Sequence, residues 1–350
     1  MGKSLKHLLI LLCLAPLTGA ALAQSQAEFQ SRDVNRPALP RLAASLLDVQ
    51  PPSARVSGDP GQLRIINRSC QSRPLGGLRQ RIVNTATQEW AFFGFSVEDQ
   101  TLSEPASPTG RVVRRPWPSM SVSEATRVAH SIAGYWAAAP DTDWLLQRQN
   151  ERWNREGITA RWRDAWSAVF ISWVICESGV ADTEQFQRAI AHHSYIDQAI
   201  RARDGQAPGA LYIAREPGSA PVVPGDLLCR GSRPVYETID QRRQQLGEGA
   251  RTHCDIVVKV DEQAREILTI GGNVRGSVRL KRLPAETSAT GHLFAPQDRG
   301  RPLFAHLALR ADSIDGDAMD HSPTLLALAC SPAAPAGPAI EIPVSGARRC

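Results

Sequence analysis

The sequence predicts an α+β fold in which helices come first and a small antiparallel sheet follows. Apolar residues recur at helical spacing through residues 78–178, whereas short β-branched runs separated by turns occupy residues 224–283. A chain of 350 residues, 42% hydrophobic and 21% charged, has ample material for a buried core. The formal net charge of +5 comes from scattered arginines, with no basic stripe, which argues against nucleic acid as a partner.

The first residues have the pattern of a secretory signal peptide. Lys3 and Lys6 precede an apolar run over residues 8–17, and a small-x-small cleavage site ends at Ala23. The apolar run is too short to cross a membrane. We therefore expect cleavage after Ala23 and a periplasmic or secreted protein with no membrane span after cleavage.

Composition divides the rest of the chain into three parts. Residues 24–74 lack clean periodicity and predict a partly ordered lead-in segment. Residues 75–285 carry all the periodic runs and predict the α+β domain. Residues 286–350 predict a C-terminal extension, which is Pro/Ala-rich at its end.

The helices are expected in the first half of that domain. Apolar spacing predicts one helix over 78–93, and the capping-box sequence "SVSE" at 121–124 predicts the start of a second. The stretch 165–178 is apolar on almost every face, which is typical of a buried helix, and Gly179 ends it. A short helix containing "AHHSYI" is expected over 184–201.

The strands are expected in the second half. A long polar segment over 230–252 separates the first predicted strand from the rest and is expected to be a loop. β-branched residues, alternation and flanking turns predict four strands, over residues 224–229, 253–260, 266–274 and 276–283.

Removal of the signal peptide leaves an even number of cysteines, which favours disulfides in an oxidising compartment. We expect the pair Cys229–Cys254 first, because each cysteine stands in a strand-like run. Cys176 can also be a buried thiol of the apolar helix. The cysteines concerned are Cys70, Cys176, Cys229, Cys254, Cys330 and Cys350.

Four motifs occur in order along the chain: "WSAVFISW", "PGDLLC", "HCDIVV" and "IGGNV". Together they resemble the CHAP and NlpC-type superfamily of cell-wall amidases and endopeptidases, which have a papain-like fold. More narrowly, residues 75–285 are similar to the exported bacterial family called domain of unknown function 2272. The resemblance implies a papain-like α+β fold with N-terminal helices packed on a small antiparallel sheet.

The resemblance also implies catalytic residues. Ser167 stands where the superfamily keeps its cysteine nucleophile, His253 takes the position of the base, and Asn273 takes that of the third member. The serine is a departure from the superfamily. A serine hydroxyl is far less acidic than a thiol and depends on the base to remove its proton. The imidazolium formed in that step gains from a carboxylate, which Asn273 cannot supply.

Asp255 is the alternative third member. It lies two residues after His253 on a predicted strand, so both side chains share a face at a Cβ separation of roughly 7 Å. Simpler interpretations also stand: Ser167 as a helix cap, His253 as a structural histidine, and Asn273 as a turn residue.

Further residues are candidates for binding substrate. Trp166 is expected to wall the cleft, His193 and Ser194 to line it, and Arg230 to meet substrate carboxylates. A solvated helix face explains His192. The histidines lack the helical spacing with a carboxylate that zinc sites use, so the sequence predicts neither a metal nor a cofactor.

These features support one leading hypothesis and two alternatives. The leading hypothesis is an exported cell-envelope protein with a hydrolase-like cleft, a serine-type peptidoglycan amidase or endopeptidase that uses Ser167 and His253. The first alternative is a catalytically inactive papain-like module that binds cell-wall peptide or another envelope partner. The second is a disulfide-stabilised structural protein of the envelope.

Overall fold

The computed structural model describes residues 38–102 and 120–329. All of the described residues belong to one compact unit. The expected signal peptide falls on residues outside the described part, as do Cys330 and Cys350.

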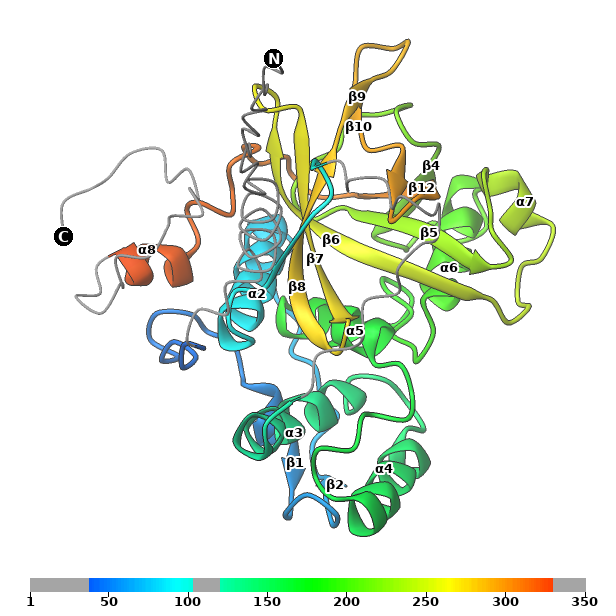
Figure 1. Cartoon of the computed structure of the whole chain (residues 1–350). Coiled ribbons are helices and arrows are strands. Elements are labelled where there is room, and N and C mark those ends of the chain that lie inside the picture. The colour runs from blue at the N-terminus through cyan, green and yellow to red at the C-terminus, as the bar shows by residue number, and fades with distance from the viewer. Residues whose placement is uncertain (1–37, 103–119, 330–350) are drawn as a thin grey trace, which may run out of the picture. The chain divides into compact units, whose positions relative to one another are not determined.

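A mixed sheet of eight strands forms the centre of the described part (Figure 1). Its strand order is β11-β12-β5-β6-β7-β8-β3, with β4 also paired to β12. Neighbouring strands are antiparallel except β3 and β8, which are parallel. The strands are β3 (Val97–Asp99), β4 (Tyr212–Arg215), β5 (Leu227–Arg233), β6 (Arg251–Asp261), β7 (Glu266–Val274), β8 (Ser277–Pro284), β11 (Gln297–Asp298) and β12 (Arg301–Leu309).

Helices α2 (Leu78–Phe92), α5 (Ser167–Glu177) and α6 (His192–Arg203) pack against the sheet. Helix α3 (Val122–Trp136) packs on α5 and on η1 (Pro52–Arg55). The described part therefore combines helices with a mainly antiparallel sheet, and the predicted α+β class is confirmed. The remaining elements are β1 (Val56–Ser57), β2 (Arg64–Ile65), α4 (Asp143–Glu156), α7 (Ile239–Arg243), β9 (Glu286–Thr287), β10 (Leu293–Phe294) and α8 (Pro323–Ala329).

The main core lies between the helices and one face of the sheet. Successive side chains of a strand point to opposite faces, so Cys254, Ile256 and Val258 of β6 enter this core. Val257, between them, enters a second and smaller cluster on the other face. Every residue of α5 is buried, as its all-round apolar sequence predicts.

The predicted cap at Ser121 is present. Its hydroxyl accepts a hydrogen bond from the backbone N–H of Glu124 at 3.2 Å, at the start of α3. We expect Ser121→Ala to lower the free energy of unfolding by about 1 kcal/mol, measured by urea denaturation, because one N–H of the first turn loses its acceptor. Ser121→Asp restores an acceptor and should unfold like the wild type. Equal stability of all three proteins would contradict the cap.

The sheet continues beyond residue 285, where the sequence suggested the end of the domain. Strand β12 pairs with both β4 and β5, and its apolar residues Leu303, Phe304, Ala305 and Leu307 are buried. Its partners are distant in the sequence, so the strand pairing is not visible in local periodicity. The expected helix over 184–201 is shorter than predicted, because α6 begins only at His192.

Two disulfides cross-link the described part. Cys229–Cys254 joins the neighbouring strands β5 and β6, which confirms the expected pair. Cys70–Cys176 ties the segment before α2 to α5, so Cys176 is not a free thiol. Among the residues described, no helix is long and apolar enough to cross a membrane.

Candidate active site

Ser167 is the first residue of α5 and lies almost inside the molecule, 8% exposed. It is not the N-cap, which is Trp166, and that residue makes no side-chain capping bond. The backbone N–H groups of the first turn of α5 are therefore not used by a capping side chain. The Ser167 hydroxyl instead bonds to another side chain: Oγ lies 2.7 Å from Nε2 of His192.

His192 is held by contacts on both ring nitrogens. Besides the Ser167 bond at Nε2, its Nδ1 accepts the backbone N–H of Cys254 at 3.2 Å and also bonds to the Tyr195 hydroxyl. A backbone N–H can only donate, so Nδ1 carries the lone pair and the proton of the neutral ring is on Nε2. The Nε2–H group therefore donates to Ser167 Oγ.

The same ring remains neutral. Burial lowers the pKa of His192 well below its usual range, and the neighbouring His253 lowers it further. The two imidazoles are edge-on, with centroids 5.1 Å apart. A neutral His192 with its proton on Nε2 has no free lone pair facing Ser167, so it is a donor to that hydroxyl and not its base.

His253 and Asp255 form a second pair on β6. His253 Nε2 lies 3.0 Å from Asp255 Oδ1. Burial opposes ionisation of Asp255, but His253 and Lys281 outweigh it and hold the pKa of the carboxyl well below its usual range. Because an ionised carboxylate only accepts, Nε2 of His253 is the donor. Burial lowers the pKa of His253 against the pull of Asp255, so the neutral ring keeps a lone pair on Nδ1.

Buried charged side chains next to the His253–Asp255 pair form ion pairs with Asp255 and with one another. Lys281 Nζ lies 2.7 Å from carboxylate oxygens of both Asp255 and Asp298, and Arg230 Nε lies 2.7 Å from Asp298. Two cations thus balance two carboxylates, and each charge has an opposite neighbour. Arg230 was expected to meet substrate, but its guanidinium is bound to Asp298 and to the Ser232 hydroxyl.

The "GGN" motif makes room for these side chains. A Cβ atom on Gly271 would lie 1.7 Å from Asp255 Oδ1, and one on Gly272 would lie 2.5 Å from the Cβ of Phe170 in α5. The register of β7 and β8 shifts at this point, and Asn273 has a positive φ of 55°. The motif therefore lets strand, helix and carboxylate approach closely.

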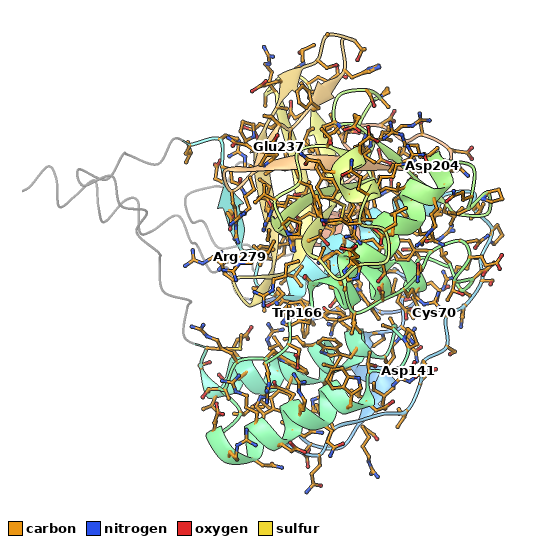
Figure 2. All side chains as sticks on the ribbon, turned by 90° about the vertical axis from the view of Figure 1, so that its right-hand side faces the viewer. Cys70, Asp141, Trp166, Asp204, Glu237 and Arg279 are labelled. Atoms are coloured by element: carbon orange, nitrogen blue, oxygen red, sulfur yellow. A yellow bond between two sulfur atoms is a disulfide. The ribbon has the colours of Figure 1, made fainter. Side chains whose placement is uncertain are left out.

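The other expected site residues have different positions. Trp166 is 1% exposed and stacks with Phe93 and Tyr135, so it is a core residue here (Figure 2). His193 Nδ1 lies 3.2 Å from the carbonyl oxygen of Ala250. The half-buried Ser194 donates its backbone N–H to the carbonyl oxygen of Ala191 in the first turn of α6.

Some of the predicted catalytic residues contact one another in the structure, and others do not. Asp255 occupies the orienting position beside His253, and no hydrogen bond joins Asn273 to that ring within the described residues. Ser167 contacts His192, and no Ser167–His253 hydrogen bond occurs in the described part. His192, expected on a solvated face, is 4% exposed.

The aspartate of "PGD" has a structural role. Asp226 accepts bonds from Arg79 at 2.7 Å and from the backbone N–H groups of Val223 and Leu309, and bonds His306 Nε2 at 2.8 Å. Burial opposes its ionisation, yet His306 and Arg79 lower the pKa of Asp226. It therefore fixes the turn before β5 to β12 and α2.

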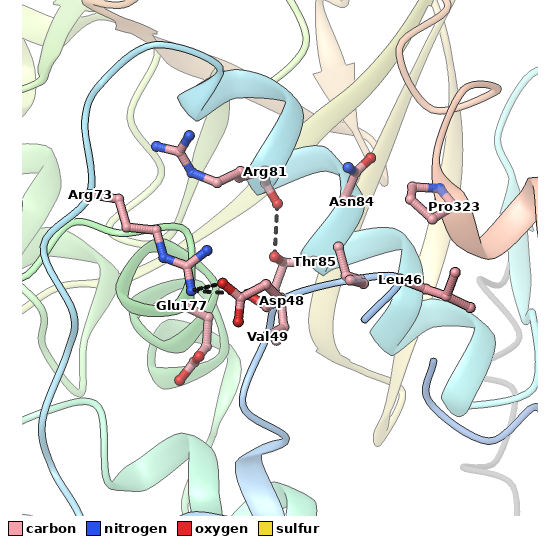
Figure 3. A pocket seen from close by; sticks show the side chains of 10 residues that line it. Leu46, Asp48, Val49, Arg73, Arg81, Asn84, Thr85, Glu177 and Pro323 are labelled. Carbon is pink, nitrogen blue, oxygen red and sulfur yellow. Dashed lines mark hydrogen bonds and ion pairs between the residues drawn. The ribbon is translucent and has the colours of Figure 1, made fainter. Parts of the chain in front are cut away.

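A pocket of about 150 Å³ lies at the other end of α5, beside Glu177 (Figure 3). Its charged side chains all have partners: Arg73 pairs with Asp48, Glu177 with Arg55, and Arg81 with three backbone carbonyls. No group of three or more metal-ligating side chains occurs among the described residues.

One comparison with known proteins gives a match. The family model described as "Uncharacterized protein conserved in bacteria (DUF2272)" matches residues 124–308, which include both histidine sites and Ser167. No curated protein and no solved structure matches the chain.

Proposed function

We propose that this chain, which belongs to the bacterial family DUF2272, is an exported serine-type hydrolase that cleaves an amide bond of cell-wall peptide. The observation that carries the proposal is the His253–Asp255 pair, with an ionised carboxylate on Nε2 and a lone pair left on Nδ1. A serine nucleophile needs that carboxylate to stabilise the imidazolium formed during attack. Asn273 could not supply it, whereas Asp255 does.

The reaction follows from these protonation states. Ser167 Oγ accepts a bond from His192, so its own proton is free for a hydrogen bond to Nδ1 of His253 that forms when substrate binds. The proton then moves to Nδ1 as Oγ bonds to the substrate carbonyl carbon. The carbonyl electrons move to oxygen, which the uncapped N–H groups at the start of α5 stabilise. The C–N bond then breaks and the imidazolium protonates the leaving amine. Water repeats the sequence and releases the acyl group.

Export is part of the proposal. The two disulfides fit an oxidising compartment. The signal-like N-terminus adds to this, and the papain-like resemblance of the four motifs supports a cell-wall peptide as substrate.

The direct test is cleavage of muropeptides by the mature protein, measured by mass spectrometry. We expect Ser167→Ala and His253→Ala to reduce cleavage about 10³-fold or more, because each removes a reacting group. Ser172→Ala is the matched control, since Ser172 is a buried serine of the same helix bonded only to the backbone of Ala189. Wild-type rates in Ser167→Ala would refute the proposed nucleophile.

The second candidate is a catalytically inactive module that binds cell-wall peptide. It is favoured by the burial of Ser167 and by its bond to a histidine that donates. Ser167→Cys separates the two functions, since a thiolate needs less help from the base than a hydroxyl. An inactive wild type with cleavage gained in Ser167→Cys would favour the binding module over the hydrolase.

A further inference from the structure

His192 belongs to the predicted site by its contacts, although neither the motifs nor the family description assigns it a role. It joins three separate elements: Ser167 at the start of α5, its own helix α6, and the backbone of Cys254 in β6. The Tyr195 hydroxyl, one turn further along α6, bonds to Nδ1, the same ring nitrogen that accepts the Cys254 N–H. The ring is buried and bonded at both nitrogens, so the side that it presents to Ser167 is fixed.

We propose that His192 is a further catalytic residue, a neutral hydrogen-bond donor that holds the Ser167 oxygen and stabilises the negative charge developing on it. The proposal rests on the proposed hydrolase function. It also gives the two histidines opposite roles: His192 donates to Oγ, and His253 receives the proton that Oγ loses.

The directions of the hydrogen bonds carry this assignment. The Cys254 N–H group occupies the Nδ1 lone pair of His192, which leaves Nε2–H as the only ring group that can face Ser167. A hydrogen bond to an oxygen strengthens as that oxygen becomes charged, so the bond stabilises the attacking oxygen more than the resting hydroxyl. Protonation of His192 is not required at any step.

The first measurement determines the tautomer. With histidine labelled by ¹⁵N, two-bond ¹⁵N–¹H spectra distinguish Nε2–H from Nδ1–H, and His192→Gln identifies the signals that belong to His192. We expect Nε2–H in the wild type at neutral pH. An Nδ1–H signal would overturn the inference even if the protein hydrolyses peptide, because the ring would then face Ser167 as an acceptor.

The second measurement uses a fluorophosphonate probe, so no natural substrate is needed. Oγ of Ser167 bonds to phosphorus, fluoride leaves, and His253 Nδ1 takes the proton. We expect His192→Phe to slow labelling about 10- to 100-fold, as loss of a donor to a charged oxygen predicts. His192→Gln, whose amide can donate from a similar position, should recover most of that loss. A labelling rate recovered in His192→Gln would show that the hydrogen bond donated to Ser167, and not the packing of the ring, is what the reaction needs. Near-UV circular dichroism checks that both variants are folded.

The outcomes separate the two proposals. Labelling of His192→Phe at the wild-type rate would overturn the role of His192 and leave the hydrolase intact. Absence of labelling in the folded wild type would remove the hydrolase and the catalytic role together, and the tautomer spectrum would then report only a structural bond.

Discussion

Asp255→Asn is expected to reduce the rate of Ser167 labelling and of peptide cleavage about 10⁴-fold. The carboxylate now accepts from Nε2 of His253 and fixes the lone pair on Nδ1. An asparagine amide can instead donate to Nε2, which moves the ring proton to Nδ1 and removes the base. Lys281 keeps a partner in Asp298, so the fold should persist.

A matched control exists on the same strand. Lys259 of β6 bonds to the buried Asp320 at 2.7 Å, so Asp320→Asn also removes a carboxylate from a buried lysine, away from His253. We expect Asp320→Asn to react within about threefold of the wild type while losing comparable stability. A rate for Asp255→Asn within tenfold of the wild type would contradict the assigned orienting role.

Replacing the Cys70–Cys176 disulfide by two serines should lower the free energy of unfolding by about 5 kcal/mol in urea denaturation. The bond closes a loop with a sequence separation of 106 residues, so it restricts the unfolded chain strongly. The same entropy argument gives about 3.5 kcal/mol for Cys229–Cys254, whose separation is 25.

The prediction is tested by which of the two serine replacements lowers the free energy of unfolding more. Each serine pair is compared with the oxidised wild type, and reducing agent is added to the wild type as a third measurement. If replacing Cys229–Cys254 lowers the free energy of unfolding more than replacing Cys70–Cys176, native-state packing around β5 and β6 outweighs chain entropy. The prediction for Cys70–Cys176 is then wrong.

Local periodicity was sufficient for much of the fold. The buried helix α5 follows from its all-round apolar sequence, and the strands β6 to β8 follow from apolar runs that pair with the next strand in the chain. Strand β12 could not be recognised in this way, because the residues of β4 and β5 with which it pairs lie 73 to 97 positions earlier, from Leu303↔Arg230 to Leu309↔Tyr212. The short strand β3 pairs in parallel with β8, and its paired residues, such as Val97 and Leu280, lie 183 positions apart in the sequence.

The site residues also differ in whether local spacing in the sequence predicts their contacts. His253 and Asp255 share a strand face, so their pairing follows from two-residue spacing. His192 reaches Ser167 only after α6 has packed on β4 and β6. Its sequence context, beside a second histidine, is typical of a solvated helix. Tyr195 was a local signal, since residues three apart on a helix lie on the same face and two ring side chains there can share a contact.

The Cys70–Cys176 bond has a consequence for how this chain is compared with others. The matched segment starts at residue 124, yet Cys176 within it is bonded to a residue outside it, and α2, also outside, packs on the sheet. A fragment cut at the matched boundaries would lose one half of a covalent link and one wall of the main core. The matched segment and the packed core therefore have different borders in this molecule, and the helix that carries Ser167 is bonded to a residue outside the match.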